Sequence, residues 1–291
     1  MLIAYRGHTD NVFAVSWSPT GRAIASAGRD KTVQIWHPDT AMQISTYARH
    51  ATYVLSTAWS PDGDHLASGD TNGAVHVWQS SIGNTRAIYL GHIRFVRSLS
   101  WSPDGQYLAS GGDFGDNTVQ VWEALDGNPL YIHKEQYRIF AAPWSPRGNA
   151  IASGAFDGTI QIWEPLSGRI LLTYRGHDGP IYAVAWSPDG HYLASTGQDM
   201  TVHIWSASDG KTLCTYRKHV GAGKAVGWSP DGALIASGGD DGTMQIWSPL
   251  TGELLATFEA HTWVRALTWS PDGQRIAVAS GKTVSVWTPD L

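Results

Sequence analysis

One stretch sets the pattern for the whole chain: Arg175–Trp205, R-G-H-D-G-P-I-Y-A-V-A-W-S-P-D-G-H-Y-L-A-S-T-G-Q-D-M-T-V-H-I-W. Copies of it recur along the 291 residues, and the tryptophans show their spacing. Seven tryptophans begin the sequence W-S-P: Trp17, Trp59, Trp101, Trp144, Trp186, Trp228 and Trp269. Seven more follow, each 18 to 21 residues later: Trp36, Trp78, Trp122, Trp163, Trp205, Trp247 and Trp287. Because the members of each series lie about 42 residues apart, the chain consists of seven copies of one unit.

Each unit has the pattern of a β-meander. Short runs rich in β-branched residues, such as I-Y-A-V-A-W and T-V-H-I-W, are separated by turn signals. The turn S-P-x-G occurs in all seven units, where proline presets φ and glycine takes the left-handed conformation. A fourth run, such as I-L-L-T-Y, comes before the G-H dipeptide. A lone unit of this size cannot bury both faces, so the sequence predicts an all-β, seven-bladed β-propeller with four antiparallel strands per blade.

The composition excludes several classes of protein. The chain has 32 glycines and a formal charge of −5, which favours turn-rich β structure and argues against a general binder of nucleic acid or anionic membranes. The single cysteine, Cys214, rules out an internal disulfide framework, and we expect it to be a small apolar residue in a strand. No apolar run approaches the roughly 20 residues that cross a bilayer, and the first residues are too short for a secretory signal, so we expect a cytoplasmic protein.

The order of G-H, W-S-P-D-G, L-A-S, an aspartate and a closing tryptophan resembles the WD40 family over essentially the whole chain. The resemblance implies a non-catalytic propeller that serves as a rigid platform for partners, without cofactor or metal. Uniform W-S-P-D-G repeats further resemble bacterial multidomain WD40 proteins. One departure is that the aspartate usually found after the closing tryptophan is replaced in every copy: His37, Gln79, Glu123, Glu164, Ser206, Ser248 and Thr288.

The repeats assign residues 1–291 to a single domain. The predicted blades are 12–47, 54–89, 96–132, 139–174, 181–216 and 223–258, with a seventh formed by 264–287 plus 2–5. The chain begins with a fourth-type strand and ends after a third-type strand, so the N-terminal strand is predicted to complete the last blade. This closure removes two exposed sheet edges.

Four units share a histidine, a serine, an aspartate and the closing tryptophan. The sets are His8, Ser26, Asp30, Trp36; His92, Ser110, Asp116, Trp122; His177, Ser195, Asp199, Trp205; and His219, Ser237, Asp241, Trp247. The same residue types form nucleophilic triads, but four active sites in one ring make little sense, and a site would also need an oxyanion hole and a cleft. In the WD40 family these positions form a structural tetrad, a buried hydrogen-bond network that joins the strands of a blade.

Three blades depart from the tetrad. In blade 2, Asn72 stands where the aspartate is expected and keeps an acceptor. In blade 4, Glu135 replaces the histidine, and Pro143 lies late in the first strand, whose free edge faces the channel. In blade 7, Val278 replaces the serine and the turn is shortened to S-G-K-T without an aspartate. We expect blade 7 to lack the network and to be among the least stable.

The copies differ most on the rim that carries the loops into the first strands and between the second and third strands. By the family resemblance, partners dock most often on this rim. Three positions there vary toward arginine and aromatic residues: those four and six residues before the W-S-P tryptophan, and the one before the tetrad aspartate. With Phe114 from the insertion G-D-F-G-D, the predicted partner-binding residues are Phe13, Arg29, Tyr53, Phe95, Arg97, Phe114, Arg138, Phe140, Phe156, Tyr182, Lys224, Trp263 and Arg265. Aromatic residues and arginine dominate interface hot spots, so we expect a protein or peptide partner with acidic and apolar residues. The alternative for any one aromatic residue is that it only covers the core between blades.

Two other functions compete with a docking platform. A channel-site hydrolase would need acidic, histidine or asparagine residues converging from several first strands, but these strands read V-F-A-V-S, V-L-S-T-A and V-R-S-L-S. A structural or self-associating module of a larger bacterial signalling protein is the other alternative. We expect a monomeric, non-enzymatic domain that binds neither nucleic acid, membrane nor metal.

Overall fold

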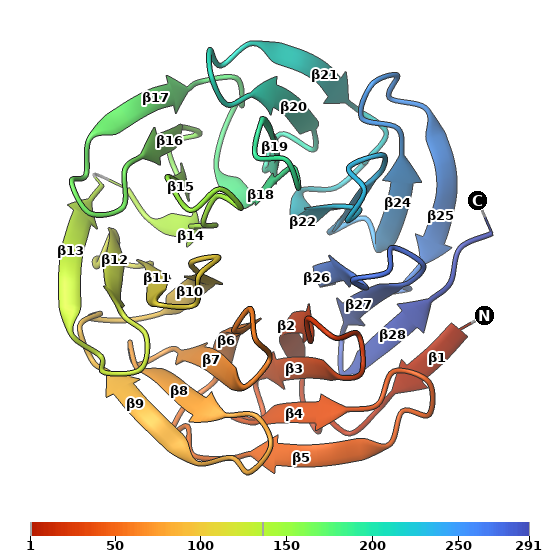
Figure 1. Ribbon diagram of the computed structural model, residues 1–291. Coiled ribbons are helices and arrows are strands. Elements are labelled where there is room, and N and C mark those ends of the chain that lie inside the picture. The colour runs from red at the N-terminus through yellow and green to blue at the C-terminus, as the bar shows by residue number, and fades with distance from the viewer. Residues whose placement is uncertain (1, 136, 291) are drawn as a thin grey trace.

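The computed structural model describes residues 2–135 and 137–290, so the first and last residues of the predicted domain lie outside the described part. Over these residues the chain forms 28 strands in seven four-stranded antiparallel sheets. The sheets stand around a common axis like the blades of a propeller (Figure 1). The prediction of a seven-bladed all-β propeller is confirmed.

The first strand of each blade lies nearest the axis and the fourth lies at the circumference (Figure 1). Blade 1 comprises β2 (Val12–Trp17), β3 (Ile24–Gly28), β4 (Val33–Trp36) and β5 (Gln43–Tyr47). Blade 2 comprises β6 (Val54–Trp59), β7 (His65–Asp70), β8 (Val75–Gln79) and β9 (Thr85–Tyr89). Blade 3 comprises β10 (Val96–Trp101), β11 (Tyr107–Gly112), β12 (Thr118–Glu123) and β13 (Pro129–Lys134). Blade 4 comprises β14 (Ile139–Ala141), β15 (Ile151–Ala155), β16 (Ile160–Trp163) and β17 (Ile170–Tyr174).

The remaining blades follow the same order. Blade 5 comprises β18 (Ile181–Trp186), β19 (Tyr192–Gly197), β20 (Val202–Ser206) and β21 (Thr212–Tyr216). Blade 6 comprises β22 (Gly223–Trp228), β23 (Ile235–Gly239), β24 (Thr243–Trp247) and β25 (Leu254–Glu259). Blade 7 comprises β26 (Val264–Trp269), β27 (Ile276–Ser280), β28 (Thr283–Trp287) and, from the other end of the chain, β1 (Leu2–Tyr5).

The N-terminal strand closes the ring as predicted. β1 pairs antiparallel with β28, from Leu2 opposite Trp287 to Tyr5 opposite Val284. Figure 1 shows the two ends of the chain side by side at this blade. The pairing gives blade 7 its fourth strand, so no blade is left with three.

Aromatic ring contacts join each outer strand to the next blade, and all but one of these contacts are stacked. The ring of Tyr174, at the end of β17, stacks on Trp205 of blade 5 with centroids 4.3 Å apart and planes 1° from parallel. Tyr5 stacks in the same way on Trp36, at 4.6 Å, so β1 also joins blade 7 to blade 1. The closing tryptophans of blades 1 to 6 are almost fully buried in these contacts. They form the largest side chains of the core.

The W-S-P tryptophans add a second connection between neighbours. In five blades the indole N–H donates to a backbone carbonyl of the preceding blade at 3.1–3.3 Å: Trp59, Trp101, Trp186, Trp228 and Trp269. The indole nitrogens of Trp17 and Trp144 are buried without a partner among the described residues. The boundaries between blades 7 and 1 and between blades 3 and 4 therefore lack this hydrogen bond.

Proline and glycine shape the strand ends as their chemistry requires. The glycines of the seven S-P-x-G turns have φ between 68° and 77°, in the left-handed region. Pro143 has no N–H for a ladder, and β14 accordingly ends at Ala141, followed only by an isolated bridge between Trp144 and Ile151. Over residues 2–135 and 137–290 there is no helix long and apolar enough to cross a membrane.

Candidate functional site

The tetrad residues of blade 5 form one buried network. His177 makes hydrogen bonds through Nδ1 to Asp199 Oδ2 at 2.8 Å and through Nε2 to Ser195 Oγ at 2.8 Å. Trp205 donates its indole N–H to the same serine oxygen at 3.1 Å. Burial alone would raise the pKa of Asp199, but the hydrogen bond from His177 and those from Thr201 lower it. The tetrads of blades 1, 3 and 6 make the corresponding bonds.

Blade 2 corrects one expectation. Asn72 does not take the place of the aspartate, because Asp70 accepts from His50 Nδ1 at 3.0 Å. His50 also contacts Ser68 Oγ at 2.7 Å, and Trp78 donates to that oxygen at 3.2 Å. Asp70 ends β7 two residues before Asn72, and its side chain reaches the histidine from there. Blade 2 therefore has a complete network with a displaced carboxylate.

Blades 4 and 7 differ from this scheme. In blade 4, Glu135 accepts from Ser153 Oγ at 2.8 Å, so a carboxylate replaces the histidine as the partner of the serine. In blade 7, Val278 is fully buried at the serine position. The nearest polar contact there joins Thr262 Oγ1 and Ser280 Oγ at 2.7 Å. Among the described residues of blade 7 no tetrad forms.

Two stacked histidine pairs are features that the sequence interpretation missed. The rings of His177 and His203 lie 4.0 Å apart, and those of His50 and His76 have the same separation. The cross-strand register could have indicated the pair in blade 5, because it places His203 opposite Ser195, the hydrogen-bond partner of His177. Burial, with the adjacent histidine acting in the same direction, lowers the pKa of His203 and of His76 to about 4. These rings are therefore neutral at pH 7.

His177, Asp199 and His203 also bring their ligand atoms within 4.8 Å of one another, as in a metal site. Both nitrogens of His177 are already hydrogen-bonded, and His203 Nδ1 lies 2.7 Å from the Tyr174 hydroxyl. In stacked rings the nitrogen lone pairs lie in nearly parallel planes, so they do not converge on one ion. The cluster is built as a hydrogen-bonded part of the core.

The predicted rim residues surround one mouth of the axis. A cavity of about 250 Å³ there is lined by residues of six blades, among them Phe13, Arg97, Tyr182, Lys224 and Arg265. Three cations thus meet at one opening. Burial lowers the pKa of Lys224; the Asp240 carboxylate opposes this shift, and Arg265 and Arg97 add to it.

A cluster of rings and guanidinium groups spans blades 3 and 4. The Arg138 guanidinium lies 4.0 Å from the Phe114 ring centroid and 5.3 Å from that of Phe156. Its Nε is 3.8 Å from the buried carboxylate of Asp113, which Arg97 Nε approaches to 3.1 Å. Phe114 and Phe156 are 49% and 44% exposed, so both side chains are partly open to solvent.

Smaller groups continue the rim on both sides. Phe140 contacts Tyr182 edge-on at 5.2 Å, and the Lys224 ammonium lies 3.5 Å above the Tyr182 ring. Arg97 lies 5.6 Å from the Phe95 ring. Across blades 1 and 2, Arg29 lies 5.2 Å from the Tyr53 ring.

Blade 7 provides a separate part of the rim. The guanidinium of Arg265 lies 4.7 Å from the ring of Trp263, which is 55% exposed. Blade 7 stands across the ring from the cluster of blades 3 and 4 (Figure 1). The predicted residues therefore share one rim but form two main groups.

Comparison with known families assigns the chain. The family described as WD domain, G-beta repeat matches residues 1–37, 42–79, 83–123, 127–164, 168–206, 210–248 and 252–288. The chain belongs to the WD40 family. Each matched WD40 segment begins with the outer strand of one blade and ends with the third strand of the next, so the repeats themselves interlock the blades.

A short segment also resembles a named relative. It is 57% identical over 30 residues to the probable cytosolic iron-sulfur protein assembly protein CIAO1 homolog of Nematostella vectensis. The match covers 10% of this chain and 9% of the relative. WD40 propellers are generally non-catalytic and commonly bind proteins or peptides.

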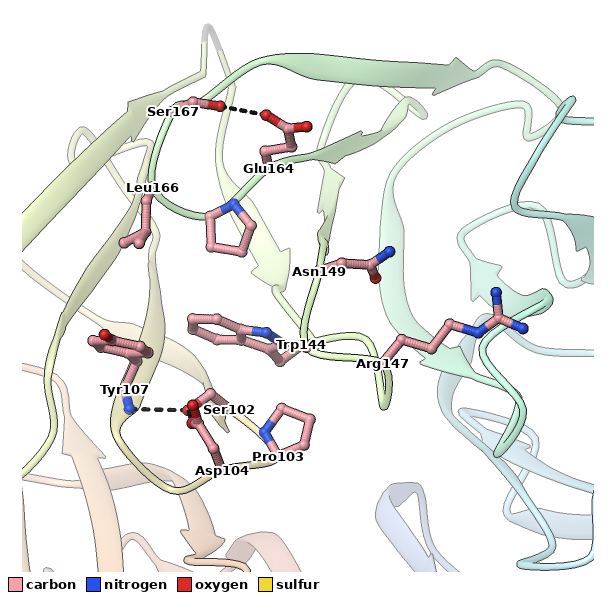
Figure 2. A pocket seen from close by; sticks show the side chains of 12 residues that line it. Ser102, Pro103, Asp104, Tyr107, Trp144, Arg147, Asn149, Glu164, Leu166 and Ser167 are labelled. Atoms are coloured by element: carbon pink, nitrogen blue, oxygen red, sulfur yellow. Dashed lines mark hydrogen bonds between the residues drawn. The ribbon is translucent and has the colours of Figure 1, made fainter.

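The face of the WD40 ring that carries the S-P-x-G turns has its own cavity, between blades 3 and 4. It measures about 550 Å³, and Figure 2 shows Tyr107 and Trp144 in it beneath Leu166. The two rings lie nearly parallel, with centroids 6.2 Å apart. The charged groups at its edge are already paired, since Glu164 bonds to Arg169 and Ser167. A related cavity of about 290 Å³ lies between blades 5 and 6.

Proposed function

We propose that this WD40 propeller is a non-catalytic platform that docks a segment of a partner protein on its aromatic and basic rim. The carrying observation is that six contacts between a cation and an aromatic ring gather on this rim. Stacking holds each long basic side chain over a ring, so less conformational entropy is lost on binding. Large planar side chains held in this way are typical of interface hot spots.

The charges of the rim favour a partner with acidic and apolar residues. Three cations, Arg97, Lys224 and Arg265, line one mouth on a chain whose formal charge is −5. Arg97 and Lys224 have carboxylate partners, so Arg265 supplies the uncompensated positive charge that favours acidic segments at this mouth. Exposed rings such as Phe114, Phe156 and Trp263 offer apolar area beside the charges. The relative is named as an assembly protein, which is the kind of role that a docking platform serves.

Partner capture by variants tests the proposal. Trp263→Ala and Phe114→Ala each remove an exposed ring, and a hot-spot loss weakens binding by about 2 kcal/mol or more. The matched control is Leu250→Ala, since Leu250 is 88% exposed in the cavity between blades 5 and 6 on the opposite face. Partners captured from a lysate by the wild-type chain are re-measured with each purified, folded variant. Undiminished affinity in both rim variants, with a loss in Leu250→Ala, would move the docking site to the opposite face.

A further inference from the structure

Three blades of the rim share one pairing. In blades 3, 5 and 6 the side chain four residues before the W-S-P tryptophan contacts the one sixteen residues further along, which lies in the loop between the second and third strands. Tyr182 donates its hydroxyl to Gln198 at 2.7 Å, and Lys224 lies 3.3 Å from the carboxylate of Asp240. In blade 3, Arg97 donates to Asp113 at 3.1 Å. Each of these polar groups therefore has a partner within its own blade.

Blade 7 lacks this pairing at a cationic position. The residue sixteen places after Arg265 is Gly281, which has no side chain and lies in the shortened turn Ser280–Thr283. Among the described residues Arg265 has no acidic partner, and its guanidinium contacts the ring of Trp263. Lys224 and Arg97 at the same mouth are balanced by Asp240 and Asp113, so the positive charge of Arg265 is the one left uncompensated.

The short turn also leaves space. A cavity of about 440 Å³ on this part of the rim is lined by Asn11, His261, Thr262, Trp263, Arg265 and Gly281. Two of these lining residues are held by hydrogen bonds. Thr262 bonds to Ser280 at 2.7 Å, and the carbonyl of Gly281 accepts from Val12 N of blade 1 at 2.8 Å. This cavity, called the gap below, lies at the boundary of blades 7 and 1. The guanidinium of Arg265 and the exposed indole of Trp263 are on its wall.

We propose that this gap binds the carboxylate of an aspartate or glutamate side chain of a partner peptide, which accepts hydrogen bonds from Arg265 while a neighbouring apolar residue of the peptide covers Trp263. The peptide carboxylate takes the place that Asp240 and Asp113 occupy in other blades. Charge-assisted bonds between guanidinium and carboxylate are the strong class of hydrogen bond, and their planar geometries match. This subsite rests on the proposed docking function and names the chemistry of one of its anchors.

Placing an acid at position 281 tests the subsite while Arg265 stays in place. Gly281 has φ +57°, a conformation that asparagine and aspartate adopt more readily than other residues. A Cβ there meets its nearest atom, Thr262 Oγ1, at 3.4 Å, which is ordinary contact. Gly281→Asp supplies the missing carboxylate, and Gly281→Asn is its neutral control with the same size and backbone demand. Differences between the two variants therefore report charge alone.

The probe is a library of random peptides displayed on phage, selected on the full-length wild-type chain. We expect the selected peptides to carry an acidic residue next to an apolar one. Their affinity should fall at least tenfold with Gly281→Asp and with Arg265→Gln, and stay within twofold with Gly281→Asn. Replacing the peptide's acidic residue by its amide should cause a similar loss for the wild-type chain and none for Gly281→Asp.

The outcomes separate the subsite from the docking function. Peptides that bind Gly281→Asp as tightly as Gly281→Asn, yet lose affinity with Phe114→Ala, would overturn the subsite and leave docking on the rim intact. Peptides that are insensitive to all rim variants, or the absence of any selected peptide, would overturn both. Equal losses with Gly281→Asp and Gly281→Asn would mean that shape, and not charge, governs the gap, which also contradicts the proposal.

Discussion

Blades 5 and 7 have the same four strands but are held together differently. In blade 5, Ser195 joins His177 and Trp205 in one buried network, and Tyr174 stacks on Trp205 with planes 1° apart. In blade 7 a valine occupies the serine position. The contact with the preceding blade is the tilted pair of Phe258 and Trp287, with centroids 5.7 Å and planes 33° apart.

The difference shows that the network can be lost where other contacts replace it. Blade 7 has the only sheet in the described residues built from both ends of the chain, so β1 supplies its outer strand. Apolar side chains such as Val278, Val284 and Val286 fill its interior. The short turn Ser280–Thr283 places Gly281 where other blades carry a side chain, so Arg265 has no partner from that loop. Blade 5 thus has a hydrogen-bonded interior, whereas blade 7 combines an apolar interior with a cavity on the rim.

Removing β1 should have the largest effect. Deleting residues 1–6 removes the pairing with β28 and the buried ring of Tyr5, which stacks on Trp36 and donates to Gln34 at 2.6 Å. Truncating a large core aromatic alone costs about 3 to 5 kcal/mol, so we expect the free energy of unfolding to fall by more than about 4 kcal/mol. Urea unfolding followed by tryptophan fluorescence measures this. Leu2→Ala, at a residue 56% exposed, is the control, and an unchanged midpoint in the deletion would contradict closure by β1.

Breaking the centre of the blade 5 network should come next. Ser195→Ala leaves the Trp205 indole N–H and one nitrogen of His177 unpaired in a fully buried place. Each unsatisfied group costs about 1 to 3 kcal/mol, so we expect a loss of about 3 kcal/mol in urea unfolding. Ser208→Ala, at an exposed position of the same blade, should stay within about 0.5 kcal/mol. Similar values for the two variants would show that the network adds little to stability.

The backbone arrangement of both blades could be predicted from the sequence. The number of blades, their four strands and the closure all follow from local runs and turns that repeat at a fixed interval. The loss of the blade 7 network was visible as Val278 and the S-G-K-T turn. Displacement of the blade 2 carboxylate to Asp70 was not, because it depends on the reach of a side chain from a strand end.

Pairing between side chains was the part that could not be predicted. His177 stacks on His203 only because two features coincide. The register of β19 and β20 sets the position of His203, and the loop before β18 places His177 beside it. The pattern of one repeat does not show either feature. On the rim, residue types indicated a basic and aromatic surface. Neutralisation of Arg97 by Asp113 is a contact between two side chains sixteen residues apart, so the isolation of Arg265 became evident only from the contacts.

Acid should affect blade 5 through His203. Its pKa of about 4 lies below the usual value near 6.5, so between these pH values the unfolded chain binds a proton that the folded chain does not. Stability from this group is therefore present above pH 6.5 and lost as the pH falls toward 4. His203→Gln places there the residue found at Gln34 and Gln245, which accept the same tyrosine hydrogen bond. Between pH 7 and 4 the variant should lose about 3 kcal/mol less than the wild-type chain in urea unfolding, because each pKa unit corresponds to about 1.4 kcal/mol and the folded ring is half protonated at pH 4.

Two further variants serve as a parallel test and a control for the pH measurement. His76→Gln should give the same gain in blade 2, since His76 has the same lowered pKa. Ser208→Ala, at an exposed position of blade 5 with no titratable group, should leave the pH dependence unchanged. Parallel pH profiles for the wild-type chain and His203→Gln would show that the buried ring takes up its proton as readily when folded as when unfolded.

The smallest effect is expected in the polar contact that blade 7 retains. Ser280→Ala removes the hydrogen bonds of its hydroxyl to Thr262 and to the Ala260 carbonyl, at 2.7 and 3.2 Å. These groups are near solvent, so water replaces the lost partner and the free energy of unfolding should fall by only about 0.5 to 1 kcal/mol. A loss as large as that of Ser195→Ala would mean that blade 7 has a network of its own centred on Ser280. Because the same bond supports the loop that carries Trp263, we expect peptide affinity on the rim to respond more strongly to this substitution than stability does.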